Sequence, residues 1–564
     1  MLDDDLPLQC MYRWERERAE RIFLTQPFGG GNVRDWTWRQ AAHEVRRIAR
    51  YLQSQGWEPG ARVAILSRNC AWWVLADLAV WMAGYVTVPV YPSLKPQSVR
   101  QILEHSGARA CFAGPTDEKE SVSAGIPEGM LTIRFPNVPA NGGMRWEKAL
   151  EASEPLEGNP TRPAGDLATI IYTSGTTGTP KGVMHSFAAF AYDGKKLAAL
   201  LGATSDQRAL SYLPLAHIVE RAGLEFPALQ LGSRLFFTEG IETFLADLHR
   251  ARPTLFLSVP RLLLKFQQGV FEKVPKEKLD KLLRLPIIDR YTKRRILRQL
   301  GLNTVIHAAC GAAPLPTEIL LWYRNLGLDL AEGYGMTETL ITHLPAPGHV
   351  RPGYVGAALE GVDLKVGAGN ELLVKSPMNM LGYFNDPQAT RDAFTPDGFF
   401  RTGDVVQLDP DGQLKIIGRL KEQFKTSKGK FVVPAPIESK LMAHPDVEAC
   451  CLMGSGYSSP FAVVLLSADA RRRCTTRDAW KAVELSLRSR LEQINAQLDP
   501  HERVQFLAVA DGPWTVGNGL MTPTLKIKRT VLENQYQTFV ENWQRTNSPV
   551  VWESPPPLST PAGT

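Results

Sequence analysis

Short apolar segments alternate with segments of helical periodicity along the first 330 residues of the chain. RVAILS (62–67) and ARACFAG (108–114) have the pattern of compact apolar strands, whereas AAHEVRRIARYLQSQG (41–56) and SVRQILEHSG (98–107) have the spacing of helices that stop at a glycine. This rhythm is typical of a largely parallel sheet with helices on both faces. A second such run covers residues 166–330. We therefore expect an α/β fold with doubly wound sheets.

The sequence changes after Tyr354 to short strand patterns separated by turns. Asp411-Gly412 lies between two alternating runs, which is a strong hairpin signal. This part is predicted to be a β-rich subdomain, and the segment after Gly418 a small α+β unit that ends near Gln544. Residues 546–564 are rich in Pro, Ser and Thr and are predicted to be a disordered tail.

The longest apolar stretch, residues 71–90, is long enough to span a bilayer. Asp77 interrupts it, and Gly84 and Pro89 break its second half, so a buried helix ending near Gly84 and a core strand fit better. The 7 cysteines show no CxxC spacing and are interpreted as reduced thiols. Because the N-terminus is acidic, unlike a secretory signal, we expect a cytoplasmic protein.

The net charge of +6 is unevenly distributed. Residues 261–300 contain 12 Lys or Arg against 4 Asp or Glu, so this window carries +8 and the rest of the chain −2. Such a patch suits an anionic surface, either phosphates or the headgroups on the inner face of a membrane, but a solvated helical face has the same pattern. No nucleic-acid partner is expected.

The sharpest local signal is the segment YTSGTTGTPKG (172–182), which follows an apolar strand pattern. It combines three glycines, five hydroxyl side chains and Lys181. Glycines let backbone N–H groups approach a ligand, and hydroxyls and a cation add donors, so the segment suits a polyphosphate. It is not a Walker loop, because Lys181 follows a proline and precedes a glycine. We expect the loop to lead into a helix near His185, and we expect that histidine to be incidental.

At this loop the chain resembles the adenylate-forming enzymes, a superfamily that includes acyl-CoA synthetases, peptide-synthetase adenylation domains and beetle luciferases. Further segments match that family's motifs in order: LPLAH (213–217), GAAP (311–314), EGYGMTET (332–339), RTGD (401–404) with Gly418-Arg419, KTSKGK (425–430) with PIE (436–438), and TPTLKIKR (522–529). Lys428, Leu525 before Lys526, and the basic insertion at 265–300 are most similar to long-chain fatty acyl-CoA synthetases. The resemblance implies a large N-terminal domain (1–420) and a small mobile C-terminal domain (421–545).

The resemblance also implies an ATP site with Mg²⁺. The residues implied to contact the nucleotide are Thr173, Ser174, Gly175, Thr176, Thr177, Gly178 and Lys181 at the β- and γ-phosphates, Gly311, Ala312, Ala313, Glu332, Gly333 and Tyr334 at the adenine, and Asp404 and Arg419 at the ribose. Thr337 would donate to the α-phosphate, and Glu338 would bind the metal with Thr173 as a second oxygen ligand. The Asp411-Gly412 hairpin independently predicts that Asp404 and Arg419 lie close together.

Two catalytic roles are implied outside the nucleotide motifs. Lys526 would bridge the substrate carboxylate and the α-phosphate, with Lys528 as a rival two positions away, and His217 would lie near the carboxylate. For the second half-reaction, the small domain would rotate about Lys421 and bring in an acceptor-thiol loop. The residues of that loop are Lys425, Ser427, Lys428, Gly429 and Lys430.

The expected reaction is ATP-dependent activation of a long- or medium-chain fatty acid to acyl-AMP, followed by transfer to coenzyme A. Small residues (Gly311, Ala312, Ala313 and Gly335) and the apolar segment 218–237 would leave room for the acyl chain. A fatty acyl-AMP ligase that loads a carrier protein, a small-acid or aryl-acid CoA ligase, and a catalytically silent lipid-binding scaffold remain as alternatives. Peripheral membrane contact is expected through residues 265–300.

Overall fold

Two large sheets form the main body of the computed structural model, which describes residues 3–117, 122–138, 142–173, 180–286, 288–522 and 526–554. The first sheet has the order β14-β13-β12-β10-β11-β1-β2, and only β2 is antiparallel to its neighbour. Its strands are β1 (Ile22–Pro27), β2 (Val33–Thr37), β10 (Arg208–Ser211), β11 (Arg234–Phe237), β12 (Leu255–Ser258), β13 (His307–Cys310) and β14 (Leu330–Glu332).

The second sheet has the order β19-β9-β8-β4-β3-β5-β6-β7, in which β9 is antiparallel to both of its neighbours, β8 and β19. Its strands are β3 (Arg62–Leu66), β4 (Val86–Val90), β5 (Ala108–Ala113), β6 (Leu131–Arg134), β7 (Met144–Arg145), β8 (Leu167–Thr173), β9 (Lys181–Ser186) and β19 (Gly382–Tyr383). The parallel strands lie at the apolar segments that alternate with helical patterns in the sequence, so the predicted α/β fold with doubly wound sheets is confirmed.

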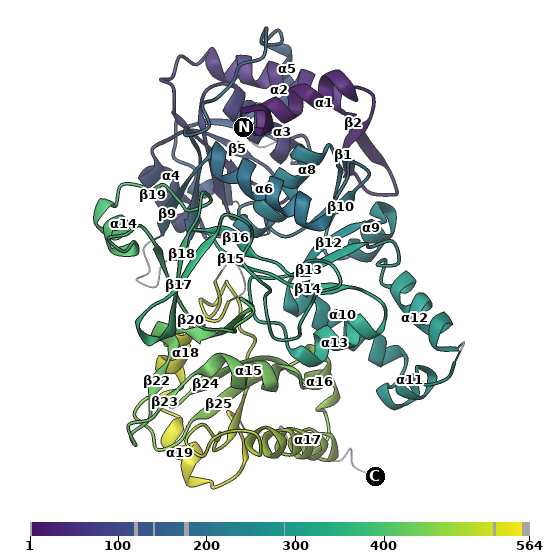
Figure 1. Ribbon diagram of the computed structural model, residues 1–564, viewed down its shortest axis with the longest axis vertical. Coiled ribbons are helices and arrows are strands. Elements are labelled where there is room, and N and C mark those ends of the chain that lie inside the picture. Colours follow the sequence, from purple (N-terminus) through teal and green to yellow (C-terminus); the bar gives the residue numbers. More distant parts are fainter. Residues whose placement is uncertain are drawn as a thin grey trace.

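Helices connect and cover these sheets (Figure 1). They are α1 (Pro7–Glu17), α2 (Trp38–Gln53), α3 (Ala71–Met82), α4 (Pro96–Ser106), α5 (Trp146–Glu151), α6 (Phe187–Leu201), α7 (Ile218–Glu220), the π-helical turn η3 (Arg221–Glu225), α8 (Phe226–Leu231), α9 (Phe244–Ala251), α10 (Pro260–Lys273), α11 (Lys276–Leu282), α12 (Ile288–Gln299), α13 (Thr317–Asn325) and α14 (Pro387–Ala393). The largest apolar core joins residues of both sheets with α2, α3, α6 and α8.

The apolar stretch at 71–90 forms α3 and β4, as predicted. Every residue of α3 is buried, including Asp77, which forms an ion pair with the buried Arg221 of η3. Pairing explains how a carboxylate is tolerated in an otherwise apolar helix. None of the helices in the described ranges combines the length and the apolar character needed to cross a membrane.

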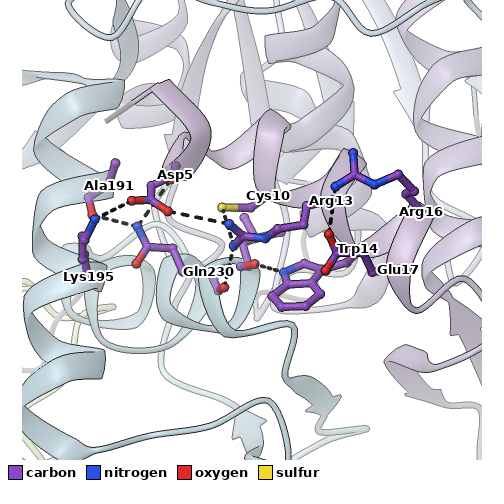
Figure 2. Close-up of polar contacts among 10 residues, drawn as sticks. Asp5, Cys10, Arg13, Trp14, Arg16, Glu17, Ala191, Lys195 and Gln230 are labelled. Carbon is purple, nitrogen blue, oxygen red and sulfur yellow. Dashed lines mark hydrogen bonds and ion pairs between the residues drawn. The ribbon is translucent and has the colours of Figure 1, made fainter. Parts of the chain in front are cut away.

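The N-terminal helix α1 packs against α8, and the 3₁₀ turn before it, Asp3–Asp5, contacts α6 through Asp5 (Figure 2). The Trp14 indole donates to the Leu229 carbonyl at 2.6 Å, and the Asp5 carboxylate lies 2.8 Å from the Lys195 ammonium. The Gln230 side chain donates to the Ala191 carbonyl at 2.7 Å, so α8 is also bonded to α6. These contacts hold in place two helices that line the apolar pocket described below.

A β-rich subdomain follows the two sheets. Its sheet has the order β17-β18-β20-β21, and a separate hairpin joins β15 and β16. The strands are β15 (Tyr334–Met336), β16 (Leu340–His343), β17 (Asp363–Val366), β18 (Glu371–Lys375), β20 (Phe400–Leu408) and β21 (Leu414–Arg419). Gly412 has a positive φ of 76° in the turn between β20 and β21, as the hairpin prediction requires.

The chain then forms a small lobe at the foot of the molecule in Figure 1. A mixed sheet β24-β25-β26-β27 and the hairpin β22–β23 are covered by helices. The elements are β22 (Phe424–Lys425), β23 (Phe431–Val432), α15 (Pro434–Met442), β24 (Val447–Met453), β25 (Phe461–Leu466), α16 (Ala468–Arg473), α17 (Arg477–Asn495), β26 (Leu507–Ala510), α18 (Arg529–Tyr536), α19 (Val540–Arg545) and β27 (Val550–Trp552).

The predicted disordered tail at 546–564 is wrong for its first part. Residues 550–552 form β27, which pairs in parallel with β26. Val550 and Val551 are buried in the core of the small lobe, because a β-branched pair completes the apolar faces of this sheet. Residues 555–564 lie outside the described part of the chain.

Polar contacts join the small lobe to the large one. Arg261 at the start of α10 pairs with Glu448 of β24, and Glu318 of α13 lies 3.2 Å from Arg490 of α17. The Gln268 side chain also donates to the Pro445 carbonyl at 3.0 Å. These polar bonds add to the apolar contacts between the lobes, such as Met442 of α15 packing against a core of the large lobe.

Candidate active site

The glycine- and threonine-rich segment connects two antiparallel strands. Thr173 at the end of β8 lies opposite Lys181 at the start of β9. The helix predicted near His185 is α6, which begins at Phe187 and is capped by the Ser186 side chain, but the strand β9, which contains His185, comes before it and was not predicted. The predicted phosphate contacts Ser174, Gly175, Thr176, Thr177 and Gly178 lie outside the described residues.

The second nucleotide motif forms the hairpin β15–β16. At Gly335 a Cβ would lie 2.1 Å from the Leu340 carbonyl oxygen, so this close approach requires glycine. Glu338 lies in the turn, and its carboxylate accepts a hydrogen bond from the Tyr383 hydroxyl at 3.0 Å. Burial raises the pKa of Glu338, while this hydroxyl and the cations Arg419 and Lys526 act in the opposite direction.

His185 contacts this motif, contrary to the expectation that it is incidental. Its Nε2 lies 2.6 Å from the Thr337 carbonyl oxygen, so the ring donates to the backbone of the residue beside Glu338. Burial lowers the pKa of His185 to about 4, and the ring is therefore neutral near pH 7. Sequence reasoning missed the role because the two residues are far apart in the chain and a single histidine carries no periodic signal.

The ribose motif brings together three side chains. Asp404 and Arg419 are register partners in β20 and β21, and the carboxylate lies 2.9 Å from the Arg419 Nε, as the hairpin predicted. The Tyr334 hydroxyl donates to the second oxygen of Asp404 at 2.5 Å. Burial raises the pKa of Asp404, and the Arg419 charge and the Tyr334 hydroxyl oppose that shift. The tyrosine ring thereby connects the predicted adenine side to the predicted ribose side.

The two turns predicted to flank the adenine lie against each other. A Cβ at Gly311 would lie 3.4 Å from the Gly333 carbonyl oxygen, and Ala312 has a positive φ of 68°. Glu332 accepts a hydrogen bond from the Leu315 backbone N–H at 3.0 Å, which ties the first turn to the second. Burial raises the pKa of Glu332 to about 7. Ala313 is exposed.

Lys526 belongs to the small lobe and acts on the nucleotide motifs across the boundary between the lobes. This boundary, with Asp404, Arg419 and Glu338 on its large-lobe side, is called the crevice below. Part of Lys526 is exposed to solvent, yet loss of hydration is the largest influence on its ammonium and lowers its pKa, followed by the charge of Arg419. The carboxylates of Asp404 and Glu338 oppose that shift, so the ammonium lies within electrostatic range of both motifs. The structure therefore brings the predicted catalytic lysine to the predicted nucleotide residues.

His217 lies on the large-lobe side of the same crevice. Burial, followed by the charge of Lys526, lowers its pKa to about 3. Its Nδ1 accepts the Val219 backbone N–H at 3.2 Å, so the neutral ring carries its hydrogen on Nε2. A neutral donor is therefore available close to the Lys526 ammonium.

An apolar pocket lies in the large lobe and shares residues with the two adenine-side turns. Part of its lining comes from Gly311, Ala312 and Tyr334, which are predicted adenine-side residues, and from Gly335. Its other walls come from α6, η3, α8 and β12, and they include the residues Leu197, Ala198, Leu201, Ala222, Gly223, Pro227, Leu231 and Leu257. Ala313 is not among the residues that line it, so this part of the pocket prediction is corrected.

The predicted acceptor loop lies in a different environment from Lys526. Lys425 ends β22, and residues 426–430 form the turn of the β22–β23 hairpin, where Gly429 has a positive φ of 77°. Lys425, Ser427, Lys428 and Lys430 are exposed, and the Ser427 backbone N–H donates to the Tyr457 carbonyl within the small lobe. Lys421, the predicted hinge, is exposed in a 3₁₀ turn between the lobes, Leu420–Glu422.

The groups around Glu338 suit Mg²⁺, which prefers oxygen ligands. Thr173 pairs with Lys181 in the register of β8 and β9, and the Lys181 ammonium lies over the Tyr383 ring. The Tyr383 hydroxyl in turn donates a hydrogen bond to Glu338. Across the described ranges, no group of three or more His, Cys, Asp or Glu side chains could hold a metal alone. A site with one carboxylate fits this arrangement, because Mg²⁺ commonly binds through one or two carboxylates and the phosphates of a nucleotide.

Comparisons with known proteins match the chain over both lobes. The model of the AMP-binding enzyme family matches residues 11–384, and that of the AMP-binding enzyme C-terminal domain matches residues 421–546. The long-chain-fatty-acid–CoA ligase FadD15 of Mycobacterium bovis is 30% identical over 94% of this chain and 95% of the relative. The peroxisomal long chain acyl-CoA synthetase 6 of Arabidopsis thaliana is 30% identical over 91% of this chain and 82% of the relative.

A solved structure shows the same fold. The adenylation domain of a carboxylate reductase from Mycobacterium chelonae has a TM-score of 0.82 at 24% identity, over 96% of this chain and 91% of that chain. The likeness that the sequence motifs predicted is thus confirmed along the chain. The chain belongs to the AMP-binding enzyme family and has the adenylate-forming fold.

Proposed function

We propose that this protein activates a long- or medium-chain fatty acid with ATP and transfers the acyl group to coenzyme A. In the first step, the carboxylate attacks the α-phosphate of ATP, which gives acyl-AMP and pyrophosphate. In the second, the thiol attacks the acyl carbonyl and AMP leaves. The observation that carries the proposal is an apolar pocket whose lining combines Gly311, Ala312 and Tyr334 with residues of α6 and α8. The names of the two relatives support the same substrate class.

The first step requires two anions to meet. The Lys526 ammonium, which lies within range of Asp404 and Glu338, would bridge the carboxylate and the α-phosphate and reduce their repulsion. Thr337 would donate to the α-phosphate, and Asp404 with Arg419 would bind the ribose. Glu338 and Thr173 would hold Mg²⁺, which neutralises phosphate charge when bound.

His217 would contribute a neutral hydrogen-bond donor. Its ring carries a hydrogen on Nε2 and stays uncharged near pH 7, because its pKa is lowered to about 3. A neutral donor can orient the substrate carboxylate without competing with Lys526 for its charge. It would remain in place for the second step, since it belongs to the large lobe.

For the second step, we propose rotation of the small lobe about Lys421. In the structure, Lys526 is at the crevice and the exposed 425–430 loop bonds within the small lobe. A rotation would exchange these two segments, and one crevice would then serve both half-reactions. Residues Lys425, Ser427, Lys428, Gly429 and Lys430 would then meet the thiol.

Residues 265–300 would provide a peripheral contact with an anionic membrane, on the cytoplasmic side. The exposed apolar side chains Leu285, Ile288 and Tyr291 lie among the cations of α11 and α12, a combination that suits headgroups and the layer below them. Sedimentation with anionic vesicles tests this contact. Unchanged binding after Arg290, Arg294, Arg295 and Arg298 are replaced by glutamine would contradict it, and neutral vesicles serve as the control.

The central test is pyrophosphate release over fatty acids of graded length, with and without coenzyme A. We expect release with long or medium chains and a thioester product when coenzyme A is present. Release without thioester would favour a carrier protein as acceptor, and release only with short or aryl acids would contradict the fatty-acid proposal. No release with any acid would leave a lipid-binding scaffold as the better explanation.

A further inference from the structure

Tyr383 lies between two motifs that are far apart in the sequence. Its hydroxyl donates to the Glu338 carboxylate at 3.0 Å, and its ring lies beneath the Lys181 ammonium, 4.9 Å from the ring centroid. Lys181 ends the phosphate segment, and Glu338 is the proposed metal ligand. One side chain therefore touches both the cation and the carboxylate that would face a metal-bound triphosphate.

The backbone around Tyr383 is held from two sides. Directly after β19, the backbone N–H of Phe384 donates to the Gly182 carbonyl at 2.7 Å. The Tyr383 N–H donates to the Thr390 hydroxyl at 2.9 Å. At Gly382 a Cβ would lie 2.8 Å from the Thr390 methyl carbon, so the neighbouring helix α14 packs closely here. The tyrosine therefore projects from a backbone that has little freedom.

A second backbone bond joins this segment to the metal-binding motif. The Met380 N–H donates to the Glu338 carbonyl at 2.7 Å. Glu338 is thus bonded through both its main chain and its carboxylate to residues 380–383. Groups that hydrogen-bond to a metal-ligating carboxylate orient it and tune its affinity, and their loss typically costs 10- to 100-fold in metal affinity or activity.

We propose that Tyr383 is a positioning residue that orients the Glu338 carboxylate toward the metal and at the same time aligns Lys181 with the phosphates. This inference rests on the proposed function, because it requires a magnesium–nucleotide complex at the crevice. Tyr383 does not touch the reacting atoms in this role. Its two contacts are separable, since the hydroxyl serves Glu338 and the ring serves Lys181.

The test measures binding rather than turnover. Mn²⁺ replaces Mg²⁺, and its binding to the full-length protein is followed by electron paramagnetic resonance with the non-cleavable analogue α,β-methylene-ATP present. The Tyr383→Phe variant keeps the ring and loses the hydroxyl. We expect the Mn²⁺ concentration for half-saturation to rise about tenfold, while binding of the analogue in the presence of a chelator stays as in the wild type.

The Tyr383→Leu variant loses both contacts. We expect the same rise for Mn²⁺ and, in addition, a two- to fivefold weaker binding of the analogue without metal, because the ring beneath Lys181 is gone. Tyr192→Phe is the matched control, since that hydroxyl also donates to an acceptor and a lysine, Lys196, also lies over its ring. It is expected to leave both measurements unchanged.

Three results would contradict the proposed role of Tyr383. An unchanged Mn²⁺ midpoint in Tyr383→Phe would overturn the inference while leaving the proposed function intact. If both variants lose metal-free binding of the analogue equally and also melt at a lower temperature, the role of Tyr383 is in folding only, and this result would also overturn the inference. If the wild type binds no Mn²⁺ with the analogue, the proposed function and the inference fail together.

Discussion

The two sides of the crevice differ in how their charged groups are held. On the large-lobe side, Asp404 is bonded to Tyr334 and Arg419, and Glu338 is bonded to Tyr383. On the small-lobe side, Lys526 is partly exposed and acts on the same carboxylates as a charge across the boundary. Carboxylates that hydrogen bonds hold in place are suited to a role in both half-reactions. A partly exposed lysine on the other lobe is suited to a role in only one of them, because it can leave when the small lobe moves.

Removal of the Lys526 charge tests the small-lobe side most strongly. We expect Lys526→Ala to slow acyl-adenylate formation by roughly 10²-fold or more, the scale for losing one preorganised donor. Thioester formation from preformed acyl-AMP and coenzyme A should change little, because the proposed rotation would move Lys526 away from the crevice before that step. Pyrophosphate release and thioester formation are measured separately.

Lys528→Ala is the matched control for this prediction. Lys528 is exposed at the start of α18, and its substitution is expected to leave both steps near the wild-type rates. Near-normal adenylation in Lys526→Ala would remove that residue from the mechanism. A loss in Lys528→Ala instead would assign the role to the rival lysine.

Restriction of the proposed hinge tests whether the two sides move relative to each other. Proline fixes φ near −65°, a value that the 3₁₀ turn at 420–422 accommodates, so Lys421→Pro should favour the conformation seen here. We expect thioester formation to fall by roughly tenfold or more, with pyrophosphate release in a single turnover nearly unchanged. Lys421→Ala, which keeps backbone freedom, should behave like the wild type. Equal loss of both steps would contradict the exchange.

Acid sensitivity tests how completely the large-lobe side is buried. His343 is fully buried, and burial lowers its pKa from 6.5 to about 3. Below pH 6.5 the unfolded chain binds a proton that the folded one does not. The free energy of unfolding therefore decreases as the pH is lowered, by up to about 1.4 kcal/mol per pH unit. The His343→Asn variant should lose this part of the slope in urea unfolding measured between pH 7 and 5.

The comparison with the variant is needed because other buried groups act in the opposite direction. Burial raises the pKa of Glu220 to about 8, so that carboxyl favours folding as the pH falls. The exposed His349 supplies the control substitution His349→Asn, which should keep the wild-type slope. Parallel curves for the wild type and His343→Asn would show that this side of the crevice admits water.

Local pattern predicted much of the large-lobe side. The Asp411-Gly412 turn was enough to place Asp404 against Arg419, because a hairpin fixes its register from the turn outward. The apolar run at 71–90 was likewise resolved into α3 and β4 by Asp77 and Gly84. In each case the residues that decide the structure are close together in the chain.

Contacts between distant segments were not predictable in this way. Tyr383 is 45 positions from Glu338 and belongs to a strand of two residues, which is too short to show a period. The many Pro, Ser and Thr in residues 546–564 led to a prediction of disorder that included the short strand VVW. The partner of this strand, β26, lies about 40 residues earlier in the chain. Tertiary pairing decides such elements, and a single sequence carries little record of it.

The polar bonds between the lobes give the prediction with the smallest expected effect, a shift in the balance between the two half-reactions. Arg261 pairs with Glu448, and Glu318 with Arg490, only in the placement described here, so they favour the arrangement with Lys526 at the crevice. Arg261 and Glu318 are 45% and 65% exposed in their side chains, so solvent screens both pairs. Exposed pairs contribute about 0.2–1 kcal/mol each, and about 1.4 kcal/mol corresponds to tenfold.

Reversal of one charge should therefore shift the balance between the half-reactions by only about two- to fivefold. In Arg261→Glu, we expect slower adenylation and faster thioester formation, since the repulsion from Glu448 disfavours the arrangement seen here. Adding Glu448→Arg to that variant should restore the wild-type ratio of the two rates. High salt should remove the difference, because it screens exposed charges. If the ratio stays constant in all three proteins at low salt, the small lobe is positioned by its apolar contacts instead, such as Met442 packing against the core beside α10 and α13.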